Sequence, residues 1–512
     1  MLNAKSPALW ISLAVLTLVT RLPFFFVDVI DWDESTFILM GHSLLNGFLP
    51  YTYIWDNKPP AIFFLFAGII SLGNDVLVVR IFGALLVFAT AAVVYALAQR
   101  LHSHRAGVFG AVVYILSMSA TVSGQATTSE LISTLPVLVA LWILVARRDN
   151  ALWYVAIGAL LSFATLVRLN LAFVVIACAP LIAVYQWERG AKECVKALIA
   201  YGIGGIAVLL AFMAPYALSG SFPLFWYSVF EAPFAYATTQ SGPLANFVQH
   251  AFNAMGVRWG FNPPQFAVGV AAWVVGVAGA GLAIKAAMGR DREQRMTLIS
   301  VLAFVIATGL SIVVSGVAPM HYLIGMLPFM TLLAGIAYAY LAERRLLVAA
   351  VATIAVCAVV MLAPVAAEYK TAWQRVGSDK GLMHGPAYDV ADYLKASCAN
   401  SSCKLYLLED HLAYTLLNVY PPRKIVTHPS NISKPSLLQA EIGAAPTPEA
   451  EMRAVLGTHP DFIVKQEKVW YLLPAQEQIL EQTLQQHYRL VHEVDGRRIY
   501  RATGNQAPRD TL

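Results

Sequence analysis

The stretch DWDESTFILMGHSLLNGFLPYTYIWDNKPP, residues 31–60, decides how the rest of the chain is interpreted. It lies between two hydrophobic segments that are long enough to cross a bilayer. Its charged residues are Asp31, Asp33, Glu34, Asp56 and Lys58. Charged side chains and irregular backbone are costly in lipid, so the stretch is predicted to be a loop at the membrane surface.

Aromatic residues accompany these charges. Tyr51, Tyr53 and Trp55 are of the types that are enriched where the membrane meets water. Charges and aromatic rings gathered at one membrane face suit a site whose substrate is half lipid and half polar. We therefore expect residues 28–74 to form a catalytic outer loop.

The composition excludes a soluble protein. Of the 512 residues, 58% are hydrophobic and only 13% are charged, and the mean hydropathy is +0.63. The formal net charge of +5 comes without a basic tract or an alternation of basic and aromatic residues, so no nucleic-acid partner is expected. Residues 8–27 lack a small-residue cleavage site and are predicted to be a retained first helix.

About eleven membrane-spanning helices are predicted from segment length and hydropathy. They lie near 8–27, 75–98, 106–122, 129–146, 151–167, 171–187, 197–218, 264–285, 297–315, 320–341 and 346–366. The connecting segments on one side hold Lys5, Arg100, Arg105, Arg147, Arg148, Arg189, Lys192, Lys196, Lys285, Arg290, Arg292, Arg295, Arg344 and Arg345. The positive-inside rule makes these segments and the N-terminus cytoplasmic. The loop 28–74, the loop 219–263 and everything after 366 are then outside.

The two outer loops have internal structure of their own. Residues 33–46 are predicted to form a short helix, and residues 61–73 are too short to span comfortably, so both are expected on or in the interface. The loop 219–263 is rich in aromatic residues and prolines. Loop packing explains this composition, and a lid over a lipid-linked ligand is the functional alternative.

The chain is predicted to divide into a transmembrane domain, 1–366, and a small outer α/β domain, 367–512. Strands are predicted at 404–408, 424–428 and 461–465, and in a final pair of strands about the turn Asp495-Gly496. Helices are predicted at 386–397, 448–456 and 475–487. No dinucleotide or P-loop glycine pattern occurs in this domain, so we assign it no chemistry.

Two of the five cysteines are candidates for a disulfide. Cys398 and Cys403 lie five apart in the polar C-terminal region, which the predicted topology places outside the membrane. An oxidising compartment would allow the bond, and the alternative is two free thiols. The other three lie in apolar spans or in a basic loop and are expected to be inert.

Ionisable residues at the outer helix ends or in the outer loops are candidates for function, because each is costly near lipid unless it is paired or hydrated. They are Asp33, Glu34, Asp56, Lys58, Arg80, Glu130, Arg168, Arg258 and His321. Ion pairs that only fix helices are the alternative, particularly for Arg80 and Glu130. Carboxylates and cations in one watery pocket suggest group transfer, in which a carboxylate takes a proton from an acceptor hydroxyl while cations stabilise a departing phosphate. The pairing of Asp33 with Lys58 makes this specific.

Several motifs resemble the C-type (GT-C) glycosyltransferases, in particular the bacterial branch related to lipid A aminoarabinose transferases and protein O-mannosyltransferases. They are Arg21-Leu-Pro, Asp33-Glu34, the run LNGFLPY at 45–51, WDNKPP at 55–60, His321-Tyr322 and Leu327-Pro328. The likeness covers roughly residues 8–366 and extends loosely to the outer C-terminal domain. It implies a polytopic helical membrane protein with a small outer α/β domain.

The resemblance also implies roles for single residues. Asp33, with Glu34 beside it, would be the catalytic base, and Lys58 would bind the phosphate of a polyprenyl-phosphate sugar. Further donor-phosphate contacts would come from Arg168 and from His321 of the His321-Tyr322 motif, and Glu130 is a loose match to a second acidic position of the family. Apart from the resemblance, we expect Arg258, an ionisable residue of the outer loops, to contact the donor phosphate as well. Asp56, Arg80, Glu130 and Tyr322 are expected to support the site.

One departure from the family pattern concerns metal binding. The aminoarabinose branch has Glu directly before the Lys-Pro, where this chain has Asn57, with Asp56 one residue earlier. A divalent cation is therefore a possible ligand but not a required one, because Lys, Arg and His can supply positive charge. No other cofactor is expected.

The sequence thus predicts a multi-pass glycosyltransferase of a bacterial inner membrane that works on the periplasmic face. Its partners would be a polyprenyl-phosphate sugar, a glycan or glycolipid acceptor and membrane lipid. The alternatives are a flippase for lipid-linked sugars, an oligosaccharide ligase that uses a lipid-diphosphate donor, and an inactive binding subunit. Charges collected at one face and the lack of an internal repeat weigh against a transporter. The sugar, the acceptor and the oligomeric state cannot be read from the sequence.

Overall fold

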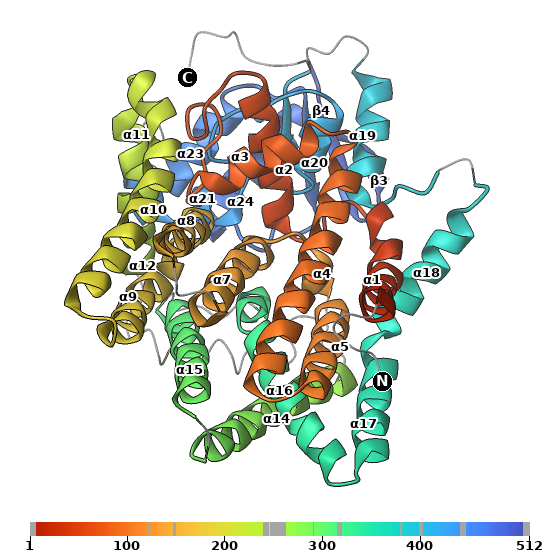
Figure 1. Cartoon of the computed structure of the whole chain (residues 1–512). Helices are drawn as coiled ribbons and strands as arrows, with labels where there is room; N and C mark the ends of the chain where they lie inside the picture. The colour runs from red at the N-terminus through yellow and green to blue at the C-terminus, as the bar shows by residue number, and fades with distance from the viewer. Residues whose placement is uncertain are drawn as a thin grey trace. The chain divides into compact units, whose positions relative to one another are not determined.

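The protein is described here by a computed structural model (Figure 1). The described residues are 7–120, 122–146, 150–238, 245, 263–289, 291–314, 320–378, 381–398, 403–440 and 447–504. The chain forms two compact units. The helical unit comprises Met1–Phe25, Arg80–Phe212 and Gln240–Gln374, and the mixed unit comprises Phe26–Val79, Met213–Thr239 and Arg375–Leu512.

The helical unit contains the long apolar helices. They are α1 (Pro7–Arg21), most of α4 (Asp75–Leu101), α5 (His104–Ala120), α6 (Val122–Gln125), α7 (Ser129–Ala146), α8 (Ala151–Val167), α9 (Ala172–Trp187), most of α10 (Ala191–Leu218), α14 (Pro263–Ala287), α15 (Arg292–Val313), α16 (Leu327–Glu343), α17 (Leu347–Met361) and α18 (Ala363–Arg375). Three short 3-10 turns accompany them: η1 (Leu22–Phe26), η2 (Leu169–Leu171) and η4 (Met320–Gly325). The predicted boundaries of 129–146 and 151–167 coincide with α7 and α8.

Helix α16 is central to the packing of this unit. It is buried along almost its whole length and packs against α5, α14 and α17. Glycines allow helices to approach closely at several crossings. Between α8 and α10, for example, a Cβ atom on Gly158 would collide with the carbonyl oxygen of Tyr201, and one on Gly204 with that of Val155. The small residues therefore fix how these helices cross.

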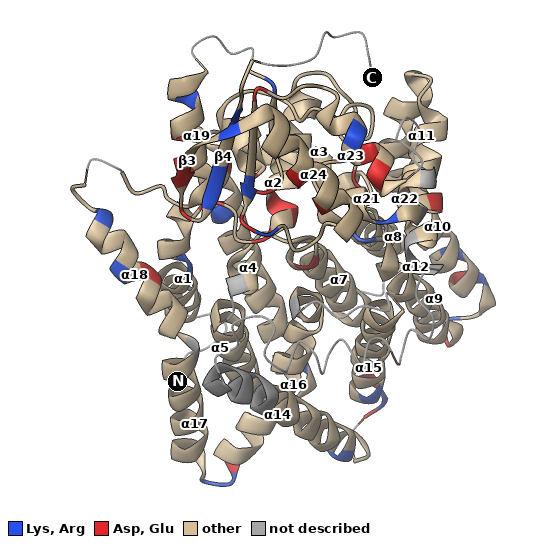
Figure 2. Cartoon of the chain, turned by 180° about the vertical axis from the view of Figure 1, so that it is seen from behind, with Lys and Arg blue, Asp and Glu red and all other residues tan. Residues whose placement is uncertain are grey.

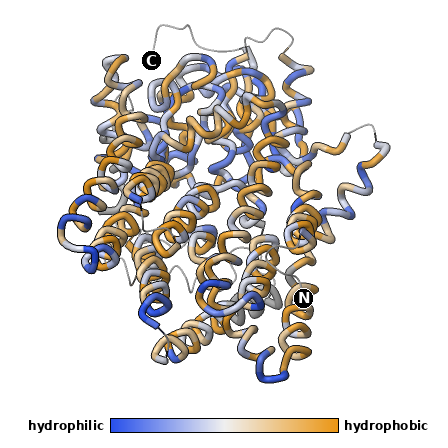
Figure 3. The backbone as a smooth tube through the Cα atoms, viewed as in Figure 1, coloured by the Kyte–Doolittle hydropathy of each residue, from blue (hydrophilic) through white to orange (hydrophobic). Residues whose placement is uncertain are grey.

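Six helices among the described residues are long and apolar enough to cross a membrane, or seven if the bent pair α17 and α18 counts as one span. Figure 2 shows few charged residues along the helices of the helical unit, and Figure 3 shows apolar helices joined by hydrophilic turns. The chain is therefore a polytopic helical membrane protein. The predicted number of about eleven spans stays a prediction.

Two predicted spans are interrupted by proline. The segment 320–341 begins as the 3-10 turn η4, and α16 starts only at Leu327, with Pro328 in its first turn. The segment 346–366 ends its first helix at Met361, and α18 begins two residues later with Pro364 in its first turn. Proline lacks the backbone donor that a continuous helix needs, so it begins a new helix at both places.

The mixed unit combines short helices with a small sheet. Its helices are α2 (Trp32–Leu45), α3 (Ala61–Ile70), α11 (Phe222–Trp226), the π-helical turn η3 (Tyr227–Glu231), α12 (Ala232–Thr238), α19 (Pro386–Ser397), α20 (Leu412–Leu416), α21 (Pro429–Ser433), α22 (Pro435–Ala440), α23 (Pro448–Leu456) and α24 (Pro474–His487). Its strands are β1 (Leu405–Leu407), β2 (Phe462–Gln466), β3 (Tyr488–Val494) and β4 (Arg497–Ala502). This unit includes the first outer loop as well as the C-terminal segment, and the predicted domain boundary at residue 366 stays a prediction.

The sheet confirms the predicted α/β character of the C-terminal region. Its strand order is β1-β2-β4-β3, with β1 and β2 parallel and the other neighbours antiparallel. Asp495 and Gly496 join β3 to β4, both with positive φ, as a two-residue hairpin turn of this type requires. The strand predicted at 424–428 is wrong, because these residues form turns that lead into α21.

The start of the first outer loop is bound to the C-terminal segment within the mixed unit. Val27 and His384 form a parallel bridge, and the backbone N–H of Asp28 donates to the carbonyl oxygen of His384 over 2.9 Å. The Asp28 carboxylate accepts from the backbone N–H of Ala387 at the start of α19. A Cβ atom on Gly385, which has φ 128°, would fall on that carboxylate, so only glycine fits. Asp28 thus caps a helix that lies far along the chain.

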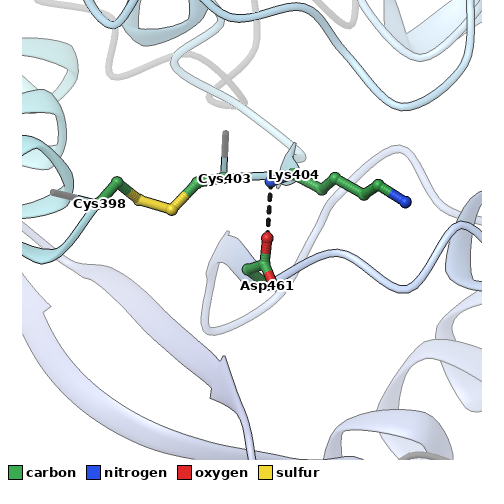
Figure 4. The surroundings of a disulfide bond; sticks show 4 residues. All are labelled: Cys398, Cys403, Lys404 and Asp461. Atoms are coloured by element: carbon green, nitrogen blue, oxygen red, sulfur yellow. Dashed lines mark hydrogen bonds between the residues drawn. A yellow bond between two sulfur atoms is a disulfide. The ribbon is translucent and has the colours of Figure 1, made fainter. Parts of the chain in front are cut away.

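Cys398 and Cys403 are joined by a disulfide in the mixed unit, with their Cα atoms 5.8 Å apart (Figure 4). The bond lies between the end of α19 and the start of β1. The next residue, Lys404, donates its backbone N–H to the Asp461 carboxylate over 2.8 Å, just before β2. The disulfide and this hydrogen bond together fix where β1 enters the sheet.

Glu409, two residues after the end of β1, is a buried carboxyl group in this part of the mixed unit. Burial raises its pKa from 4.5 to about 7, although the nearby Arg497 guanidinium lowers it. Arg497 itself donates to the Asp410 carboxylate over 3.0 Å. The folded state therefore binds a proton at Glu409 at pH values where the unfolded chain has released it.

The stability of the mixed unit should fall as the pH rises from about 5 to 8, because the folded pKa of Glu409 is higher than its unfolded value. We expect a contribution on the order of 2 kcal/mol, which Glu409→Gln should remove. Thermal unfolding of the purified full chain at pH 5 and 8 measures it, with exposed Glu467→Gln as the control. An unchanged pH dependence in Glu409→Gln would contradict this assignment.

Candidate active site

Helix α2 of the mixed unit carries Asp33 in its first turn. Asp31 is the N-cap residue, and its carboxylate accepts from the backbone N–H of Asp33 over 3.1 Å. Glu34 turns its carboxylate back to the N–H groups of Ile30 and Asp31, at 3.1 and 3.4 Å. This capping box begins the helix. The contacts of Glu34 are therefore those of a residue that positions the first turn, whereas the sequence suggested a catalytic role beside Asp33.

Asp33 and Lys58 form an ion pair within the mixed unit. The Lys58 ammonium donates to Asp33 Oδ2 over 2.9 Å. The two side chains are only 8% and 16% exposed, so each charge is largely removed from water. A shielded charge is costly without a partner, and each residue therefore depends on the other. The structure brings together the two residues that the sequence predicted to pair.

A tight turn holds Lys58 in this position. The Tyr51 hydroxyl donates to the carbonyl oxygen of Lys58 over 2.6 Å. The backbone N–H of Tyr51 donates to the carbonyl oxygen of Ile54 over 3.0 Å. The Tyr51 ring is fully buried and contacts the rings of Phe63 and Tyr216. Tyr51 has a φ of 72°, which is uncommon for a residue with a side chain. The buried ring and its two hydrogen bonds hold the backbone in that conformation.

Trp32 anchors the other side of the site. Its ring packs edge-on against His411 and Tyr471, in the core beneath the sheet, with ring centres 5.2 and 5.6 Å away. Its indole N–H donates to the carbonyl oxygen of Thr427 over 3.0 Å. Because Trp32 directly precedes Asp33, the C-terminal segment fixes the first turn of α2.

His428 is a member of the site that the sequence analysis missed. Its Nε2 atom lies 3.3 Å from Asp33 Oδ1, on the carboxylate oxygen that Lys58 does not occupy. Burial on its own lowers the pKa of His428, but the hydrogen bond to Asp33 and the charges of Asp56 and Asp33 outweigh burial and raise it. A single histidine in a segment predicted as a strand carried no signal for this role.

Asp56 is fully buried close to this pair. Its Oδ1 atom accepts from the backbone N–H of Asn57 over 2.9 Å and from the Asn431 side-chain amide over 3.3 Å. Its Oδ2 atom is buried without a hydrogen-bond partner among the described residues. The negative charge of Asp56 therefore acts on His428, and its supporting role in the site stays a prediction.

A divalent cation fits this donor set poorly. Both oxygens of Asp33 face cationic or hydrogen-bonding nitrogens, and Asp56 has one oxygen to offer. Within the described ranges, no group of three His, Cys, Asp or Glu side chains is placed to hold a metal ion. We therefore derive no chemical step through a metal.

The helical unit contains a second cluster of predicted residues. Glu130, in the first turn of α7, forms an ion pair with Arg168, which ends α8. The side chains are 1% and 10% exposed. Arg168 also donates to the Asn170 side chain over 3.0 Å. The pair links α7 to α8, as expected if the ion pair of Glu130 serves only to fix helices. It also places the Arg168 cation at the edge of a small cavity.

His321 and Tyr322 join this cluster from the turn η4. The Arg168 guanidinium lies over the Tyr322 ring, 4.1 Å from its centre, and His321 Nε2 is 3.9 Å from Glu130 Oε1. Glu130, Arg168 and Tyr322 line the cavity, together with residues of α15 and α16. Four predicted residues from three distant segments therefore meet within the helical unit.

The two predicted site residues that remain are Arg80 and Arg258. Arg80 is buried within α4, and Arg258 lies outside the described residues. Arg21, which the sequence singled out only as part of a motif, is buried and donates to the carbonyl oxygens of Gly124 and Gln125, both over 2.8 Å. Arg21 thus fixes the break between α6 and α7 of the helical unit.

Known proteins resemble this chain in part of its sequence and in its fold. The family model described as dolichyl-phosphate-mannose-protein mannosyltransferase matches residues 57–217, which is less than half of the chain. No curated protein sequence matches.

Solved structures resemble the chain over nearly its whole length. ArnT from Cupriavidus metallidurans bound to undecaprenyl phosphate is 16% identical, with a TM-score of 0.62 over 98% of this chain and 99% of that one. The same protein in the apo state is 14% identical, with a TM-score of 0.61 over 96% and 97%. The apo oligosaccharyltransferase from Archaeoglobus fulgidus is 10% identical, with a TM-score of 0.53 over 90% and 69%.

These likenesses agree with the motifs in the first outer loop and confirm the resemblance that the sequence indicated. The match to the mannosyltransferase family includes Lys58 and the segments that carry Glu130 and Arg168. The structural likeness extends beyond that match to the C-terminal α/β region. The chain therefore has the fold of ArnT over nearly its whole length, and residues 57–217 are similar in sequence to the dolichyl-phosphate-mannose-protein mannosyltransferases.

Proposed function

We propose that this protein is a membrane glycosyltransferase that moves a sugar from a polyprenyl-phosphate donor to a cell-envelope glycan or glycolipid. The observation that carries the proposal is the shielded ion pair of Asp33 and Lys58 at the start of α2. The likeness to ArnT solved with undecaprenyl phosphate, and to the dolichyl-phosphate-mannose-protein mannosyltransferase family, supports a lipid-phosphate donor.

In this mechanism Asp33 is the general base. The acceptor hydroxyl attacks the anomeric carbon of the sugar and transfers its proton to the Asp33 carboxylate. The bond between the anomeric carbon and the phosphate oxygen breaks, and the polyprenyl phosphate leaves with the electron pair. Lys58 stabilises the charge on the departing phosphate. A single displacement of this kind inverts the anomeric centre.

Arg168 and His321 would add positive charge toward the donor phosphate. Within the helical unit, Arg168 forms an ion pair with Glu130, and His321 lies close to the same carboxylate, so the charge of Glu130 offsets theirs until a phosphate arrives. Arg guanidinium groups suit phosphate because they donate two parallel hydrogen bonds. Arg258 is proposed as a further phosphate contact only because it is an ionisable residue of the second outer loop, with Asp56, Arg80 and Tyr322 as supporting residues.

The site is proposed to work on the periplasmic face of a bacterial inner membrane. Basic residues gather in the turns and adjoining helix ends where α4 meets α5, α9 meets α10, and α16 meets α17, and the positive-inside rule makes these regions cytoplasmic. The mixed unit carries the disulfide between Cys398 and Cys403, which suits an oxidising compartment. A cytosolic nucleotide sugar could not reach a site on that face, so a lipid-carried donor is required.

Asp33→Asn should abolish sugar transfer but leave donor binding intact, because the amide cannot accept the proton while the phosphate contacts remain. We expect turnover to fall at least about 100-fold. The assay supplies purified protein in nanodiscs with radiolabelled polyprenyl-phosphate sugars and total envelope lipid. Asp392→Asn, an exposed change on α19, is the matched control.

Transfer of label by wild type and Asp392→Asn alone would support the proposal. Equal transfer by Asp33→Asn would overturn the role of this base. Consumption of lipid-diphosphate donors only would favour an oligosaccharide ligase. If no donor is bound or consumed, the proposal fails, and flipping in proteoliposomes tests the transporter.

The double change Arg168→Gln with Glu130→Gln should weaken donor binding about tenfold, because a charge-assisted phosphate contact is lost. Changing both partners together avoids leaving a buried charge unpaired. The dissociation constant of the donor in nanodiscs measures the effect, and exposed Arg189→Gln is the control. Unchanged donor affinity would mean that Arg168 and Glu130 only join α7 to α8 and do not contact the donor.

A further inference from the structure

The C-terminal segment of the mixed unit delivers His428 to the carboxylate of Asp33. The His428 Nε2 atom is 3.3 Å from Asp33 Oδ1, and Lys58 Nζ is 2.9 Å from Asp33 Oδ2. Each oxygen of the carboxylate thus has its own nitrogen partner. The two partners come from different parts of the chain, Lys58 from the first outer loop and His428 from the turn before α21.

The backbone on both sides of His428 is bound to the first outer loop. The Thr427 carbonyl oxygen accepts from the Trp32 indole over 3.0 Å and from the Thr36 hydroxyl over 2.8 Å. On the other side, the side-chain amide of Asn431 donates to the carbonyl oxygen of Trp55 over 3.2 Å. The backbone N–H of Asn431 donates to the carbonyl oxygen of His428 over 3.0 Å and so ties His428 to this anchor. His428 is therefore fixed against α2 by several contacts that do not involve its own ring.

The charges around His428 favour a hydrogen bond donated to Asp33. The groups that act on its ring are the carboxylates of Asp33 and Asp56, the ammonium of Lys58 and the ring of His411. Burial lowers the pKa of His411 to about 3, so that ring is neutral. Two carboxylates against one ammonium leave negative charge that an imidazolium compensates.

Lys58 cannot serve two anions equally well. In the proposed function it contacts the donor phosphate, and its hold on Asp33 then weakens. Without another partner, the Asp33 carboxylate could rotate and its ionised form would lose a stabilising charge. His428 approaches the other oxygen, away from Lys58, so it can keep its contact throughout the reaction.

We propose that His428 is a positioning residue that orients Asp33 and keeps it ionised while Lys58 engages the donor phosphate. This inference rests on the proposed function and gives the C-terminal segment a part in the reaction. His428 itself forms no bond with the sugar.

The test compares wild type with His428→Leu and His428→Gln in the full chain in nanodiscs, using the radiolabelled polyprenyl-phosphate sugar that wild type consumes. His428→Leu removes the donor and the charge, and His428→Gln keeps an amide donor without the charge. His492→Gln, an exposed histidine of β3, is the matched control. The readouts are kcat, KM for the donor, and kcat/KM between about pH 3 and 9, a range that includes the ordinary pKa of an Asp carboxyl group.

We expect kcat of His428→Leu to fall about 10- to 100-fold while KM for the donor changes less than about threefold, and His428→Gln to recover part of the loss. The acid limb of kcat/KM should move to higher pH in both variants, by about one pH unit, because the carboxylate loses a nearby cation. A purely structural role would lower activity without moving this limb.

Wild-type kinetics and an unmoved acid limb in the His428 variants would overturn the inference and leave the proposed function standing. Should His428→Leu fail to fold, His428→Gln decides by the same criterion. Absence of transfer by the wild type would overturn the proposed function and this inference with it.

Discussion

The ion pair between Asp33 and Lys58 is the interaction on which the mixed unit depends. Both side chains are largely shielded, and a shielded charge is tolerated only with a partner at hydrogen-bond distance. Each residue is held separately, Asp33 by the capping box of α2 and Lys58 by the turn that Tyr51 closes. The first outer loop must therefore fold compactly if its charges are to leave the lipid.

The loop does not achieve this by itself. Trp32 packs into the core beneath the sheet, Asp28 caps α19, and Trp55 donates its backbone N–H to the carbonyl oxygen of Lys424 over 2.8 Å. The second outer loop contributes Ser228, whose hydroxyl accepts from the Trp55 indole over 2.9 Å. Three segments that are distant in sequence thus form one compact unit around the charge pair.

Local patterns predicted much of this structure. Helices with strong periodicity and clear ends, such as 386–397 and 448–456, lie where they were expected, and so does the turn at Asp495-Gly496. The pairing of Asp33 with Lys58 was also predictable, because both lie in one short loop that lipid cannot accept.

Long-range partners were not predictable from these patterns. Residues 424–428 have the composition of a strand, yet the carbonyl oxygens of Lys424 and Thr427 accept from Trp55, Trp32 and Thr36 instead of a neighbouring strand. The same long-range contacts bring His428 to Asp33, and nothing within a window of ten residues encodes them. Sequence reasoning therefore found the charge pair of the site and missed the partner that the C-terminal segment adds.

The most direct test of the central claim is the affinity for undecaprenyl phosphate, without a sugar, in nanodiscs. If Lys58 is poised to exchange Asp33 for a lipid phosphate, Lys58→Ala should bind at least about tenfold more weakly than wild type, since one charge-assisted contact is lost. Asp33→Asn should bind as tightly or more tightly, because the competing carboxylate is gone, and exposed Lys468→Ala should match wild type. Equal affinity of Lys58→Ala and wild type would contradict the account.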